Sequence, residues 1–85
     1  MDNDTIDIVE RAFEDAAPYL SNSSYLRKRI GEIVSKVRKI DELLKAIEEA
    51  CFEEKETQIR TDFRIFLNAL RRELQKMGAA YGSKI

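Results

Sequence analysis

The longest apolar pattern in the chain runs from residue 26 to residue 51, where apolar residues recur at alternating spacings of four and three. Only an α-helix brings positions with these spacings to one side of the chain. The pattern therefore predicts one long helix over about residues 23–52, capped near Ser23 and interrupted on its outer face only by Gly31. The apolar positions are Leu26, Ile30, Ile33, Val37, Ile40, Leu44, Ile47 and Cys51.

Shorter apolar patterns on either side of this stretch predict two further helices. Before it, Ile6, Val9 and Phe13 repeat at helical spacing, and Pro18 disfavours helical geometry at the residue that precedes it. These features predict a helix over about residues 5–17. After it, a second apolar pattern predicts a helix over about residues 58–77, and residues 78–85 are expected to form a flexible tail. The positions of the second pattern are Ile59, Phe63, Phe66, Leu70, Leu74 and Met77.

The connection over residues 53–58 leaves two architectures open, because no glycine or proline marks a turn there. In the first, the chain reverses and forms an all-α, three-helix antiparallel bundle within a single helical domain over residues 1–85, which could also assemble as a dimer. In the second, one helix runs from residue 24 to residue 77 with a skip in its coiled-coil repeat, and it would assemble as a dimer.

The order of charges along the chain bears on this choice. Residues 1–20 hold six acidic and one basic residue, and residues 21–40 hold one acidic and six basic residues. Residues 41–56 hold seven acidic and two basic residues, and residues 57–85 hold two acidic and six basic residues. Folding each acidic segment beside a basic neighbour favours the three-helix bundle, although an antiparallel dimer of long helices satisfies much of the same pattern.

The residue composition argues against catalysis. The chain has no histidine, which is the commonest general base and zinc ligand, and its one cysteine lies on the apolar pattern among glutamates that disfavour a thiolate. The acidic residues show no metal-binding motif, and the three glycines are isolated, so no phosphate-binding loop is present. We therefore expect neither an enzyme nor a bound cofactor or metal. The acidic N-terminus and the lack of a long apolar run favour a cytoplasmic protein that does not span a membrane.

These features predict a non-enzymatic protein–protein interaction module or small helical subunit, which self-associates as an oligomer or docks on a protein partner. A homodimer is the expected assembly, since a domain of 85 residues buries a limited core. Ile8 and Ile65 lie off the main apolar positions of their helices, and Tyr81 is a large side chain in the tail. These three residues are candidates for partner binding.

A second hypothesis concerns the basic first half of the long predicted helix. Its cations could bind an anionic surface, either nucleic acid or lipid. The charges are spread around the helix, and Tyr25 is the only aromatic residue nearby on which a base could stack, so a nucleic-acid partner is an alternative that the sequence does not favour. The candidate anion-binding residues are Arg27, Lys28, Arg29, Lys36, Arg38 and Lys39.

The last predicted helix and its tail, QIRTDFRIFLNALRRELQKMGAAYG, resemble the end of the small helical immunity proteins that protect bacteria from their own bacteriocins. This resemblance covers less than a third of the chain, and it implies a small immunity-type helical bundle as a further alternative.

Overall fold

The computed structural model describes residues 3–76, and all regular secondary structure in this range is helical. The prediction of an all-α protein is therefore confirmed. The elements are α1 (Asn3–Ala16), the 3-10 helix η1 (Ala17–Tyr19), α2 (Ser23–Val34), α3 (Ile40–Glu53) and α4 (Thr57–Lys76).

The predicted continuous helix over residues 23–52 is wrong, because the structure divides it into α2 and α3. At the end of α2, the Ser35 hydroxyl donates a hydrogen bond of 2.7 Å to the carbonyl oxygen of Glu32. Before α3, the backbone N–H of Arg38 donates a hydrogen bond of 2.9 Å to the carboxylate of Glu42. This bond holds the pKa of Glu42 below its ordinary value. Such local bonds satisfy the backbone where the helix stops, and the expected three helices become four.

The length of the molecule explains why this break is favourable. A straight helix over residues 23–52 would be about 45 Å long at 1.5 Å per residue, whereas the longest dimension of the fold is 33 Å. The ends of such a helix would extend beyond the fold. The break lets α2 and α3 each turn their apolar side toward α4.

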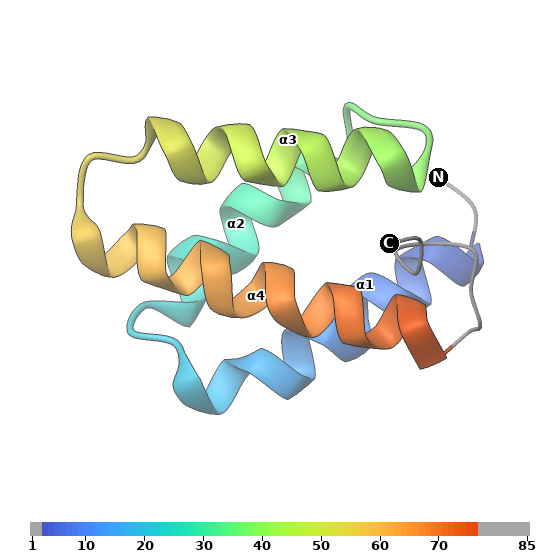
Figure 1. Cartoon of the computed structure of the whole chain (residues 1–85), viewed down its shortest axis with the longest axis horizontal. Helices are drawn as coiled ribbons and strands as arrows, with labels where there is room; N and C mark the ends of the chain where they lie inside the picture. Colours follow the sequence, from blue (N-terminus) through green and yellow to red (C-terminus); the bar gives the residue numbers. More distant parts are fainter. Residues whose placement is uncertain (1–2, 77–85) are drawn as a thin grey trace.

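The chain reverses direction between α3 and α4. The backbone of Glu54 is extended, and α4 begins three residues later at Thr57. As a result, α3 and α4 lie side by side and run in opposite directions (Figure 1). The alternative of one helix from residue 24 to residue 77 is therefore wrong.

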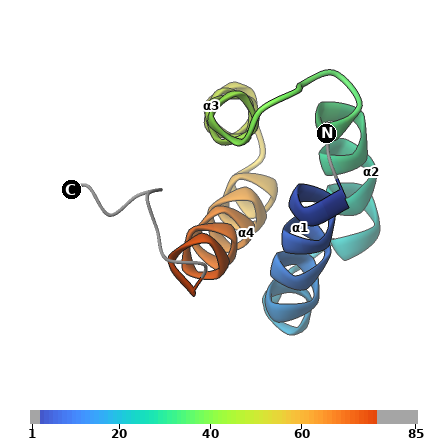
Figure 2. The same cartoon turned by 90° about the vertical axis from the view of Figure 1, so that its right-hand side faces the viewer.

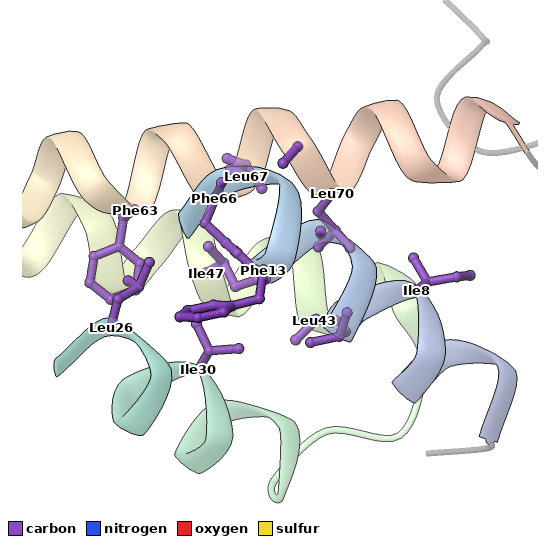
Figure 3. Close-up of a cluster of buried hydrophobic side chains, with 14 of the residues drawn as sticks. Ile8, Phe13, Leu26, Ile30, Leu43, Ile47, Phe63, Phe66, Leu67 and Leu70 are labelled. Carbon is purple, nitrogen blue, oxygen red and sulfur yellow. The ribbon is translucent and has the colours of Figure 1, made fainter. Parts of the chain in front are cut away.

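α4 is the central element of the fold. It lies between α1 and α3, and α2 crosses behind it (Figures 1 and 2). Its rings Phe63 and Phe66 are fully buried, and Figure 3 shows Phe13 of α1 beside Phe66, with the ring centroids 6.2 Å apart. The remaining core is aliphatic: Ile8, Val9, Ala12, Ala16, Leu26, Ile30, Leu43, Ile47, Ala50, Leu67, Ala69, Leu70 and Leu74.

Two ion pairs join oppositely charged segments in the predicted combinations, although α1 packs mainly along α4. Glu10 of α1 lies 3.7 Å from Arg27 of α2, and Glu48 of α3 lies 2.6 Å from Arg71 of α4. Both pairs are half exposed, so each contributes about 0–1 kcal/mol at most. Their value is in selecting which helices lie together.

A buried carboxylate fixes the start of α2. Asp62 of α4 is 1% exposed and accepts hydrogen bonds of 2.8 Å from the backbone N–H groups of both Ser21 and Asn22. The side chain of Asn22 in turn accepts a bond from the backbone N–H of Tyr25 and caps the helix. Asp62 thereby attaches the entrance of α2 to the central helix.

Candidate functional site

The described surface has an apolar groove between α1 and α2. Its volume is about 140 Å³. One wall comes from α1, where Ile6 is 39% exposed although most apolar residues of the helix are buried. The residues that line it are Ile6, Val9, Glu10, Phe13, Arg27, Ile30, Gly31 and Val34. We refer to this set as the α1–α2 groove.

Gly31 lines the α2 side of the groove. It lies inside α2, where glycine costs about 1 kcal/mol relative to alanine. A Cβ atom built at this position would meet nothing within 4 Å, so packing against a neighbouring residue does not require the glycine. The missing side chain leaves free space on the α2 wall instead.

The rim of the groove is polar on one side. The guanidinium of Arg27 lies 4.2 Å from the centre of the Phe13 ring and also pairs with Glu10. A cation–π contact of this kind contributes about 0.5–1 kcal/mol where the cation is exposed, as Arg27 is. The groove therefore combines an apolar floor with a pair of charged side chains at its edge, which is typical of surfaces that receive an apolar side chain of another molecule.

The most exposed large apolar side chain of the described residues is Phe52, which is 88% exposed near the end of α3. Three acidic residues, Glu48, Glu49 and Glu53, accompany it on the exposed part of the same helix. Tyr19 in η1 is the next most exposed at 72%. An aromatic ring this exposed gains free energy from any partner that removes it from water.

The structure does not bring the predicted partner-binding residues together on the surface. Ile8 is 5% exposed and belongs to the core, so the expectation that it lies outside the buried side of its helix is wrong. The reason is that α1 packs along α4, while its other side meets α2 at the groove, so the buried part of α1 is wider than one apolar pattern. Ile65 is half-buried against the core, and Tyr81 lies outside the described residues.

The six predicted anion-binding residues do not share one surface either. Arg27 belongs to the groove rim, whereas Arg29 donates hydrogen bonds of 3.1 Å to the hydroxyl of Tyr25 and 2.9 Å to the carboxylate of Glu54. The hydroxyl and then the carboxylate raise the pKa of Arg29 above its ordinary value. The charge of Arg29 is thus already engaged within the fold. The others, Lys28, Lys36, Arg38 and Lys39, are exposed along α2 and the connection to α3.

Cys51 of α3 lies beside the first turn of α4. The thiol of Cys51 is half-buried and donates a long hydrogen bond of 3.6 Å to the carbonyl oxygen of Arg60. In this part of the chain, no three Cys, Asp or Glu side chains converge closely enough to hold a metal ion. None of the described helices has the length and apolarity required to cross a membrane.

The structure thus describes a small all-helical protein with an apolar groove on its surface. Residues 7–76 match the MJ1579 family, and because this match covers most of the chain, the protein belongs to that family. Comparison with curated proteins and with solved structures gave no match.

Proposed function

We propose that this protein is a non-enzymatic interaction module that associates with a second copy of itself, with Phe52 of one copy entering the α1–α2 groove of the other. The observation that carries the proposal is the apolar groove between α1 and α2, where there is free space around Gly31. Phe52 is the described side chain that best fits it, because the ring is almost fully exposed.

The size of the groove suits an aromatic ring. An apolar cavity of about 150 Å³ is large enough to bind benzene, and the groove measures about 140 Å³. Its apolar lining offers the contacts that such a ring needs, from Ile6, Val9, Ile30 and Val34.

The positions of Phe52 and the groove favour contact between copies over contact within one copy. The end of α3 that carries Phe52 and the first half of α1 lie toward opposite ends of the molecule (Figure 1). Each copy therefore offers one ring and one groove. In a dimer with a twofold axis, the ring of each copy can enter the groove of the other, which closes the assembly. In a head-to-tail arrangement, each copy would leave one ring and one groove free, so that further copies could add.

Charge adds little to the proposed contact. Phe52 lies among the exposed glutamates 48, 49 and 53. At the groove, Arg27 already pairs with Glu10, and the exposed α2 residues Lys28 and Glu32 carry opposite charges. The apolar fit of the ring in the groove therefore carries the proposed contact.

The expected association is weak. Burying one phenylalanine side chain contributes about 1.5–3 kcal/mol, so a reciprocal pair contributes about 3–6 kcal/mol. Lost translational and rotational freedom costs at least about 4 kcal/mol. The two rings alone therefore supply a net of at most about 2 kcal/mol, and a dissociation constant near 1 mM, which corresponds to about 4 kcal/mol, requires further burial where the two copies meet around each ring.

Sedimentation equilibrium from about 10 µM to about 1 mM tests this proposal. We expect the average mass of the wild type to rise with concentration, and we expect Phe52→Ala and Gly31→Leu to remain monomeric. Two matched controls should associate like the wild type. Tyr19→Ala removes an exposed aromatic ring elsewhere, and Gly31→Ala adds only the Cβ atom for which space exists.

Three results would contradict the proposal. The first is a wild type that stays monomeric throughout the concentration range. The second is association that survives either Phe52→Ala or Gly31→Leu. The third is loss of association in Tyr19→Ala equal to that in Phe52→Ala, because the effect would then follow exposed aromatic surface in general.

A further inference from the structure

The solvent side of α4 carries charges of one sign. The helix has two acidic residues, Asp62 and Glu73, and both are buried, at 1% and 5% exposure. Its other charged residues are all cationic and lie at exposed or half-buried positions. These residues are Arg60, Arg64, Arg71, Arg72 and Lys76.

The two acids are occupied inside the fold. Asp62 accepts the backbone N–H groups at the entrance of α2, and the buried carboxylate of Glu73 accepts a bond of 3.1 Å from Lys76. Arg71 pairs with Glu48 across the α3–α4 contact. Arg64 and Arg72 form no ion pair with any residue in the described range, so their charges face solvent uncompensated.

The free cations lie on one side of the helix. Arg60, Arg64 and Arg72 are separated by four and eight residues, which places them within a sector of about 120° around the helix and about 18 Å along it. The exposed neutral residues between and beyond them, Thr61, Asn68 and Gln75, can all form hydrogen bonds. Figure 2 shows that no other described helix covers the side of α4 that is turned away from α1 and α2. We refer to these six residues as the α4 polar face.

We propose that the α4 polar face binds the phosphate backbone of double-stranded DNA. Arginine offers a planar pair of donors that matches a phosphate group, and threonine, asparagine and glutamine also donate to phosphate oxygens. The α4 polar face is rich in these side chains. A positively charged helical face with hydrogen-bonding residues between its cations is what a helix needs to lie against a duplex.

Other anionic partners fit this face less well. A lipid surface requires large apolar residues that enter the membrane, and the α4 polar face has none. A single strand requires aromatic side chains on which bases stack, and this face has none of those either. The major groove of B-form DNA accepts the width of one helix, whereas the major groove of an RNA duplex is too narrow.

The proposal does not depend on the groove between α1 and α2. It assigns anion binding to α4, whereas the sequence placed the candidate anion-binding residues on the basic first half of the predicted long helix. In that part of the chain, Arg29 is already bonded to Tyr25 and Glu54. The net charge of −1 does not oppose it, because phosphate binding follows the local arrangement of cations. Three or four phosphate contacts predict an affinity that falls with a slope of about −3 in log K against log salt.

Fluorescence anisotropy with a labelled DNA duplex of about 20 base pairs, at about 20 to 200 mM salt, tests the proposal. We expect the wild type to bind at low salt. The double variant Arg64→Gln/Arg72→Gln should weaken binding at least about tenfold and should reduce the magnitude of the slope of log K against log salt by about 2. The matched control is Lys28→Gln/Lys36→Gln, which removes the same charge from exposed positions on and beside α2. It should change the affinity less than about twofold, and Phe52→Ala should leave it unchanged.

Several outcomes would overturn the proposal. Absence of binding at the lowest salt is one. Equal losses in the α4 and α2 double variants are another, since binding would then follow net charge alone. A third is strong competition by another polyanion. If an RNA duplex, polyglutamate or anionic vesicles displaced the labelled DNA as well as unlabelled DNA does, the face would be assigned to a different partner. Circular dichroism of each variant establishes that the helices are intact.

Discussion

At the level of single residues, Asp62 joins parts of the chain that are 40 and 41 positions apart. Its carboxylate accepts two backbone N–H groups that lie before the first turn of α2, where no helical partner exists for them. Each bond is 2.8 Å long and involves a charged acceptor, and such bonds are stronger than those between neutral groups.

We expect Asp62→Ala to lower the free energy of unfolding by about 1–3 kcal/mol, because removal of the acceptor leaves partly buried donors unsatisfied. Urea denaturation followed by circular dichroism measures this loss. The control is Asn68→Ala, which changes an exposed residue of the same helix and should stay within about 0.5 kcal/mol of the wild type. Equal midpoints for the two variants would show that the carboxylate does not hold α2 in place.

The sequence could not assign this role to Asp62. It lies one residue before Phe63 in an apolar pattern, and an aspartate in such a place is usually solvated. Only the path of the chain around α4 brings Ser21 and Asn22 against it. The same limit applies to Ile8, whose burial depends on a second packing partner, and to Glu73, whose burial leaves α4 with a cationic face.

At the level of elements, the apolar spacing predicted helical structure. The three-helix bundle, one of the two architectures that the sequence left open, also included the chain reversal before α4. It could not reveal the break between α2 and α3, because the apolar pattern continues in phase through Val37 and Ile40. The signals for the break were polar and local: Ser35 at the end of one helix, and Asp41 and Glu42 in the first turn of the next. Acidic residues in a first turn mark the start of a helix.

The start of α3 also supports a prediction about its cap. Lys39 occupies the N-cap position with an extended backbone and provides no side-chain hydrogen bond. We expect Lys39→Ser to raise the free energy of unfolding by about 0.5–1 kcal/mol, because serine can accept an N–H of the first turn and would complete a capping box with Glu42. Thermal and urea denaturation measure the gain. Lys36→Ser makes the same chemical change outside the cap, and an equal gain there would refute a capping effect.

The groove shows the same limit of sequence analysis. Gly31 is visible in the sequence as an interruption of a helix, and Ile6, Phe13 and Ile30 are visible as apolar positions. That they line one hollow follows from how α1 lies against α2. Helical periodicity assigns each apolar residue to a side of its own helix, but it does not determine how completely a neighbouring helix covers that side.

At the level of the whole molecule, alternating charges along the chain predicted two contacts that the structure contains, α1 with α2 and α3 with α4. They did not predict that α4 is the central helix, because its position is set by buried rings and not by ion pairs. The resulting fold has a Cα radius of gyration of 12.0 Å, close to the value of about 12 Å expected for a compact chain of this length.

This compactness can be measured by small-angle X-ray scattering at several concentrations. Extrapolated to infinite dilution, the radius of gyration should lie within a few ångströms of 12.0 Å, whereas a straight helix of 54 residues would be about 80 Å long and give about 23 Å. If Phe52 enters the groove of a second copy, the radius of the wild type should rise with concentration while that of Phe52→Ala stays constant. A large radius at infinite dilution would contradict the fold itself. A radius of the wild type that is independent of concentration would contradict only the association, so the two conclusions are separated by one set of measurements.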